Sequence, residues 1–84
     1  MKELDRVRLI KDRAEYAKEG VQKGDVGTLM MGDRNGYVLV FFDGEEYQAY
    51  GVTLISDIDV AVRSEDLAVL DENDPDYIPK AKAR

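Results

Sequence analysis

Apolar and polar residues alternate along much of this chain, which is the pattern of half-buried β-strands. The alternation predicts strands at 5–9, 26–31, 57–63 and 68–70. Residues 37–42 are β-branched, aromatic or leucine and carry no charge, so they predict the central strand of a sheet. A further strand is expected at 47–55, with a bend at Gly51. The pattern therefore predicts an all-β fold of five to six strands.

Glycine marks the predicted turns. Asn35-Gly36 favours the left-handed backbone of a tight hairpin turn, Gly24 indicates a second turn, and residues 43–46 indicate a third. Gly27 lies inside a predicted strand, where glycine is typical of a bulge or of the close approach of another backbone.

Three segments do not alternate. Residues 12–19 contain good helix formers but span only two turns, so we expect a long loop with one helical turn, in which Tyr16 packs on the sheet. Ser64 followed by acidic residues predicts a 3₁₀ turn before the last short strand. Residues 71–84 contain both prolines and many charges, which predicts a disordered, flexible charged tail after a domain at 1–70.

Composition restricts the chemistry. The 84 residues suffice for one domain with a small core, and they include no cysteine, histidine or tryptophan. The net charge is −6, and residues 25–76 carry thirteen acidic side chains against two basic ones. Such a surface repels phosphate backbones and favours a basic partner, or no charged partner at all if it only keeps the protein soluble. Because the chain shows no secretory signal and no apolar run that would span a membrane, we expect a cytoplasmic protein.

Part of the sequence resembles a known signature. Val7-Arg8-Leu9, a loop, and then Gly24 and Gly27 resemble the KOW-type signature of SH3-like barrels, with Leu29 in place of the usual valine. Over about residues 4–70 the chain is similar to short uncharacterised bacterial SH3-like proteins and to the small barrel of photosystem I subunit IV. The resemblance implies a small SH3-like barrel with a 3₁₀ turn before its last strand. KOW domains usually bind RNA or proteins and are commonly basic, whereas this chain is acidic.

The sequence offers little support for catalysis. Neither serine, Ser56 or Ser64, has a histidine to activate it. Asp57 and Asp59 could share one strand face and hold a hard metal ion, but their alternation with apolar residues favours a plain solvent-facing side. The acidic run 71–76 lacks the glycine and the distal glutamate of an EF-hand loop. We therefore predict no enzymatic activity, no cofactor and no metal.

Binding is the favoured class of function. Tyr16 and Tyr50 are candidate aromatic contacts. Arg6, Arg8 and Lys11 are the candidate basic contacts, and they belong to the one basic cluster, which also includes Arg13, Lys18 and Lys23. We predict a non-enzymatic protein-interaction module for a basic protein partner, a class that includes immunity- and antitoxin-like proteins. The alternative is a KOW-like RNA- or ribosome-associated module, which the net charge disfavours. The strand predicted at 47–55 has few charges to protect its edge, so a homodimer is a further alternative.

Overall fold

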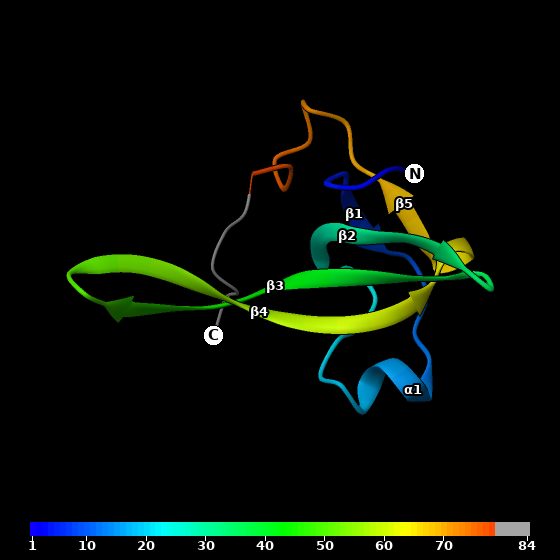
Figure 1. Ribbon diagram of the computed structural model, residues 1–84, viewed down its shortest axis with the longest axis horizontal. Coiled ribbons are helices and arrows are strands. Elements are labelled where there is room, and N and C mark those ends of the chain that lie inside the picture. Colours follow the sequence, from blue (N-terminus) through cyan, green and yellow to red (C-terminus); the bar gives the residue numbers. More distant parts are fainter. Residues whose placement is uncertain (79–84) are drawn as a thin grey trace.

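Five antiparallel strands form one sheet in the computed structural model, in the order β4-β3-β2-β1-β5 (Figure 1). The structure describes residues 1–78, without the side chains of Asp33 and Arg34. The prediction of an all-β fold with a 3₁₀ turn before the last strand is confirmed. The elements are β1 (Arg6–Leu9), α1 (Ala14–Ala17), β2 (Val26–Arg34), β3 (Tyr37–Ala49), β4 (Val52–Arg63), a 3₁₀ turn (Ser64–Asp66) and β5 (Leu67–Val69).

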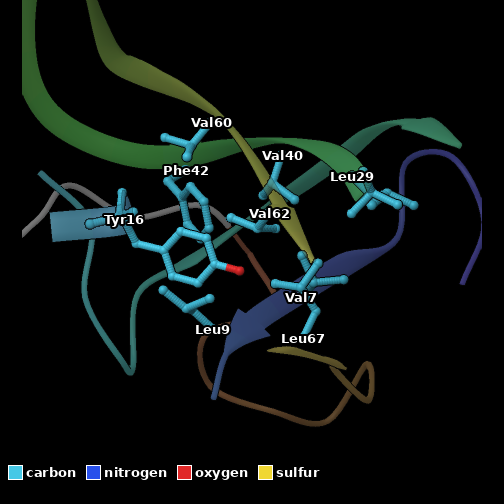
Figure 2. Close-up of a cluster of buried hydrophobic side chains, with 11 residues drawn as sticks. Val7, Leu9, Tyr16, Leu29, Val40, Phe42, Val60, Val62 and Leu67 are labelled. Carbon is cyan, nitrogen blue, oxygen red and sulfur yellow. The ribbon is translucent and has the colours of Figure 1, made fainter. Parts of the chain in front are cut away.

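The core lies on one side of this sheet (Figure 2). Alternate residues of the strands point into it, as the sequence pattern predicts, and the loop around α1 adds Tyr16 and Val21. Burial of one such side chain contributes about 1.5–3 kcal/mol. The buried strand residues are Val7, Leu9, Leu29, Val38, Val40, Phe42, Val60, Val62 and Leu67.

Gly27 lets β2 and β3 approach each other closely. It pairs with Phe42, and a Cβ atom at this position would lie 2.5 Å from the carbonyl oxygen of Phe41. Any side chain here would collide with the backbone of β3, which is the close approach that a glycine inside a strand indicates.

Two hairpin turns use the left-handed backbone. Asn35 and Gly36, between β2 and β3, have φ angles of 57° and 81°. Between β3 and β4 the corresponding residues are Tyr50 and Gly51, with φ angles of 53° and 74°. The strand predicted at 47–55 is therefore wrong, because this segment contains the end of β3, a tight turn and the start of β4.

A β-bulge replaces the turn predicted at 43–46, and that prediction is also wrong. The β3–β4 pairing passes from Asp43 opposite Asp57 to Glu46 opposite Ile55, so Gly44 and Glu45 together lie opposite Ser56. The Ser56 hydroxyl accepts from the Glu45 amide at 3.0 Å and donates to the Glu45 carbonyl at 3.1 Å. A Cβ atom on Gly44 would overlap the Ser56 backbone, so this glycine serves the bulge.

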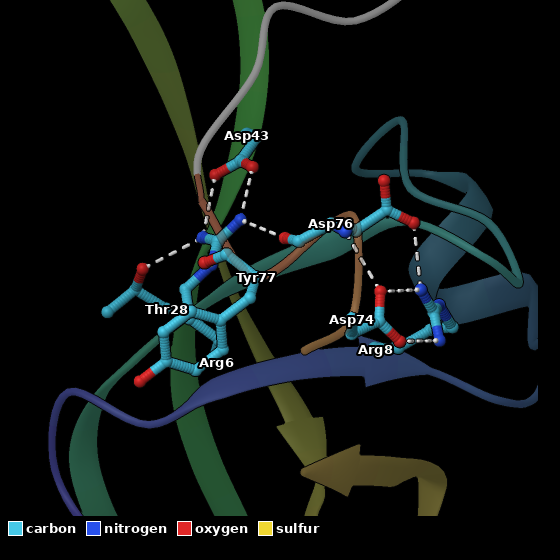
Figure 3. Close-up of polar contacts among 7 residues, drawn as sticks. All are labelled: Arg6, Arg8, Thr28, Asp43, Asp74, Asp76 and Tyr77. Carbon is cyan, nitrogen blue, oxygen red and sulfur yellow. Dashed lines mark hydrogen bonds and ion pairs between the residues drawn. The ribbon is translucent and has the colours of Figure 1, made fainter. Parts of the chain in front are cut away.

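The described part of the predicted tail lies against β1. The Asp74 amide donates to the Asp71 carbonyl at 2.9 Å and closes a turn. After this turn, Asp74, Asp76 and Tyr77 contact the arginines of β1 (Figure 3). The remainder of the predicted tail, 79–84, lies outside the described residues.

Candidate interaction surface on the β3–β4 arm

The hairpin formed by β3 and β4 extends beyond the rest of the sheet (Figure 1). The last pair between β2 and β3 joins Gly27 to Phe42, and past that point β3 pairs with β4 alone. We call residues 44–57, which form this two-stranded extension, the arm. It contributes to the 41 Å length of the molecule along its longest axis.

One face of the arm is apolar and the other is mostly polar. Cross-strand partners in a sheet share a face, and Tyr47 pairs with Leu54 while Ala49 pairs with Val52. On the opposite face Glu46 pairs with Ile55 and Gln48 pairs with Thr53. The Gln48 side chain donates to the Thr53 hydroxyl at 2.7 Å, which ties the polar face together.

The apolar face continues the core side of the sheet. Along β4, Leu54 lies on the same face as Ile58, which packs against the core, because these positions are separated by an even number of residues. The bulge at Gly44 and Glu45 shifts β3 by one residue, which moves Tyr47 onto this face. Without the bulge, Glu46 would point there instead.

Nothing in the described part of the chain buries this face. Tyr47, Val52 and Leu54 are 47%, 54% and 40% exposed, and Tyr50 at the tip of the arm is fully exposed. Single exposed apolar residues are ordinary on a protein surface, whereas a contiguous group of them is typical of an interaction site.

The surroundings of the arm are acidic. No lysine or arginine occurs from 35 to 62, whereas this stretch contains five carboxylates. All of them except Glu45, which is in the bulge, lie on the face of the sheet opposite Leu54. The arm therefore presents an apolar face on one side and negative charge on the other, and the negative charge attracts basic groups. The five residues are Asp43, Glu45, Glu46, Asp57 and Asp59.

Arg6, one of the predicted binding residues, is buried in a saturated network instead (Figure 3). Its guanidinium donates to both carboxylate oxygens of Asp43, at 3.0 and 2.6 Å. It also donates to the Thr28 hydroxyl at 3.0 Å and to the carbonyls of Asp76 and Tyr77 at 3.1 and 2.8 Å. These bonds use all five donors of the side chain.

The other predicted basic residues differ in their surroundings. Arg8 is bound by the carboxylates of Asp74 and Asp76, at 3.2 and 2.8 Å, and these hydrogen bonds raise its pKa. Lys11 is exposed. Of the predicted residues, Tyr50 lies on the arm, whereas the basic ones lie in β1 and the loop that follows it.

Tyr16, the second aromatic candidate, belongs to the core. Its ring is buried, and its hydroxyl donates to Asp66 at 2.5 Å and accepts from the Arg63 amide at 2.9 Å. Burial, together with the Asp66 hydrogen bond, raises the pKa of Tyr16 to about 12. The guanidinium of Arg13, at 2.5 Å from Asp66, lowers the pKa of that carboxylate.

Sequence reasoning missed the apolar face of the arm. The sequence signal for it was the pair Tyr50-Gly51, which lies at the centre of the apolar positions 47, 49, 52 and 54. Had a turn been placed at Tyr50 and Gly51, the pairs Tyr47–Leu54 and Ala49–Val52 would have followed directly from hairpin geometry.

The described residues hold no grouping of three acidic, histidine or cysteine side chains arranged to bind a metal ion. Among residues 1–78 there is also no helix whose length and hydropathy would let it cross a membrane. No protein-family model matches the chain, and no curated protein or solved structure matches it either.

Proposed function

We propose that this chain is a non-enzymatic protein-interaction module that binds a basic partner protein through the arm. The observation that carries the proposal is the exposed apolar face formed by Tyr47, Ala49, Val52 and Leu54. A two-stranded ribbon is at best marginally stable in water unless something packs on its apolar face. A partner that covers this face would gain about 25 cal/mol for each Å² of apolar surface removed from water.

The charge around the arm supports a basic partner. Glu46, Asp57 and Asp59 lie on the face opposite the apolar one, in a stretch that contains no lysine or arginine. Complementary charge speeds association and rejects acidic competitors, while the apolar contacts supply most of the affinity. The combination of one apolar and one acidic face therefore fits a partner that presents lysine or arginine next to its apolar contact.

The geometry gives less support to RNA binding. Three of the arginines that would meet phosphate are already paired with carboxylates: Arg6 with Asp43, Arg8 with Asp74 and Arg13 with Asp66. Each would have to leave its carboxylate before it could contact a phosphate, and the carboxylates left behind would repel the nucleic acid.

The test compares the natural chain with two double variants. Tyr47→Ser with Leu54→Ser removes the apolar face of the arm, and Ile10→Ser with Val69→Ser removes two similarly exposed apolar residues outside it. Proteins captured from lysate of the source cell, with and without nuclease treatment, are identified, and the affinity of the purified partner for all three proteins is measured by calorimetry.

We expect the arm variant to bind at least about tenfold more weakly, while the control variant binds like the natural chain. Equal binding by the arm variant would contradict the proposal. It would also fail if the captured material disappeared on nuclease treatment, because that result would favour the RNA-binding alternative. Circular dichroism of both variants establishes that the fold is intact.

A further inference from the structure

The outer edge of β4 is long and unpaired. β4 stands at one end of the sheet, and no strand within residues 1–78 pairs with its outer side. Proteins usually protect such an edge with proline, lysine, a bulge or a very short strand. β4 is 12 residues long, contains no proline or lysine, and has the bulge on the partner strand instead.

Two hydrogen bonds show which backbone groups point outward. The Ser64 amide donates to the Gly36 carbonyl at 2.9 Å, toward β3, whereas the preceding amide, that of Arg63, donates to the Tyr16 hydroxyl at 2.9 Å. Amide directions alternate along a strand, and the β3–β4 register is unbroken from Arg63 back to Asp57. The N–H and C=O groups of Ala61, Asp59 and Asp57 therefore point away from β3.

The Tyr16 hydroxyl closes one end of this edge, and the other end is open. The hydroxyl occupies the outward amide of Arg63, so the outward groups that no backbone group within residues 1–78 pairs with begin at Ala61 and continue toward the arm. A depression of about 290 Å³ lies between α1 and β4 next to these groups. Its lining is Glu15, Glu19, Asp59, Val60 and Ala61.

The side chains next to the open edge determine what could pair with it. Asp57 and Asp59 are exposed on one face of β4, and the other face presents Leu54 and the partly buried Ile58. A strand added beside β4 would place alternate side chains next to these two sets. The added strand would best place lysine or arginine beside the two aspartates, and aliphatic residues on the other face beside Leu54 and Ile58.

We propose that β4 accepts an added β-strand from the partner, and that this strand alternates basic with aliphatic side chains. The inference rests on the proposed function, because it identifies how a basic partner engages the chain. Backbone hydrogen bonds from the outward groups of β4 supply affinity, and the alternating side chains supply selectivity. The apolar face of the arm extends the same contact beyond the edge of the core.

A second copy of the chain is a poor occupant of this edge. In a two-fold antiparallel pairing centred on Asp59, that carboxylate would face the same carboxylate of the other copy, and like charges directly opposite each other are destabilising. A basic strand removes this repulsion and gains ion pairs in its place.

The experiment uses synthetic peptides as probes. The peptide Lys-Val-Lys-Val-Lys-Val matches the proposed alternation, and Lys-Lys-Lys-Val-Val-Val has the same composition without it. Binding to the ¹⁵N-labelled chain is followed by NMR, and amide hydrogen exchange is measured with and without peptide. We expect the alternating peptide to slow exchange at Asp57, Asp59 and Ala61, whereas amides that already pair with β3, such as Val60, change little.

Two variants test the backbone and the charge separately. Ala61→Pro removes one outward donor at an edge position where proline is tolerated, and it should weaken binding of the alternating peptide at least about tenfold. Asp57→Lys with Asp59→Lys, which reverses the charge of the edge, should weaken binding of this peptide by a similar factor. Glu3→Lys with Glu72→Lys, which makes an equal change of net charge outside β4, should weaken it much less.

Strand addition is overturned if the alternating peptide does not bind, if it binds without protecting the three amides, or if the block peptide binds equally well. The hydrogen-exchange measurement uses the natural chain, so it decides the question even if Ala61→Pro does not fold. The proposed function is tested separately, by partner capture with and without nuclease and by the effect of the arm variant on partner binding.

Discussion

Arg6 shows how one residue connects three distant parts of the chain. Its guanidinium joins β1 to Asp43 on β3, to Thr28 on β2 and to the backbone at 76 and 77. The pair with Asp43 is largely shielded from water, since the two side chains are 7% and 14% exposed. A shielded charge is tolerated only while its partner is present, so the stability of this network depends on both residues.

Replacing Asp43 by leucine should therefore destabilise the fold strongly. The change leaves the Arg6 charge buried without its carboxylate, and loss of one partner of a buried ion pair typically costs about 3–5 kcal/mol. The matched control is Asp57→Leu, because Asp57 is the exposed cross-strand neighbour of Asp43 and should change the free energy of unfolding by less than about 0.5 kcal/mol. Urea denaturation of both variants measures the difference, and equal stabilities would contradict the buried-pair interpretation.

Tyr16 predicts a dependence of stability on alkaline pH. Its pKa rises from an ordinary value near 10.0 to about 12 in the folded chain, so the folded state retains the phenolic proton longer than the unfolded state. The resulting stabilisation is fully present below pH 10 and is lost as the pH rises toward 12. Tyr16→Phe should flatten this part of the curve of unfolding free energy against pH.

The same variant should also lower stability at neutral pH. Without the hydroxyl, the Arg63 amide loses its hydrogen-bond partner, and an unsatisfied buried group costs about 1–3 kcal/mol. Asp66 loses one of its hydrogen bonds but keeps those from Arg13. Urea denaturation from about pH 8 to pH 11.5 tests both statements. A slope that is equally steep in the variant would contradict the assignment of this alkaline loss of stability to Tyr16.

At the scale of elements, the bulge decides which side chains the arm presents. Gly44 has no room for a Cβ atom because the Ser56 backbone occupies that space. Gly44→Ala should therefore shift the arm or break its pairing, at a cost of about 1–3 kcal/mol. Gly32→Ala is the matched control, since a Cβ atom on Gly32 meets nothing within 4 Å and its φ angle is ordinary.

NMR measures the effect of the two glycine variants directly. In Gly44→Ala, the contacts between Tyr47 and Leu54 should weaken and amide exchange should accelerate in the arm, while the core strands keep their protection. In Gly32→Ala, the contacts between Tyr47 and Leu54 and the amide exchange of the arm should be unchanged. Undiminished contacts between Tyr47 and Leu54 in Gly44→Ala would show that the bulge does not require glycine.

The sequence identified the core and one hairpin because both depend on local patterns. Alternation located Val60 and Val62, and Asn35-Gly36 marked a turn by residues that adopt the left-handed backbone readily. The Tyr50-Gly51 turn was missed because a tyrosine with positive φ is uncommon. Gly44 was misinterpreted because a bulge glycine and a turn glycine look alike until the partner strand is known.

The role of Arg6 was beyond reach for a different reason. Its partners Thr28, Asp43 and Tyr77 lie 22, 37 and 71 residues away, so no local pattern connects them. From sequence it was one member of a basic cluster, and only the register of β1, β2 and β3 places these side chains on one side of the sheet. Tyr50 was a candidate aromatic contact from sequence and is exposed at the tip of the arm, but the apolar face behind it depended on a hairpin that the sequence pattern did not locate.

At the scale of the whole molecule, net charge and the open edge of β4 act together. A strand of this length with an open outer edge is a template for pairing with another copy, and the chain carries a net charge of −6 that opposes such contact. Asp57 and Asp59 place part of that charge directly on the edge. We therefore expect the natural chain to stay monomeric at neutral pH and low salt, with these two carboxylates as the local barrier.

Asp57→Asn with Asp59→Asn should accordingly promote self-association. The variant keeps the shape of the edge and removes the repulsion that would oppose antiparallel pairing of two copies. Glu3→Gln with Glu72→Gln removes the same two negative charges from positions outside β4, so this variant should remain monomeric if position rather than total charge is decisive. Sedimentation velocity over a range of concentrations distinguishes the three proteins. Equal association of both variants would assign the barrier to net charge alone, and no association of either would show that the edge is protected by its shape.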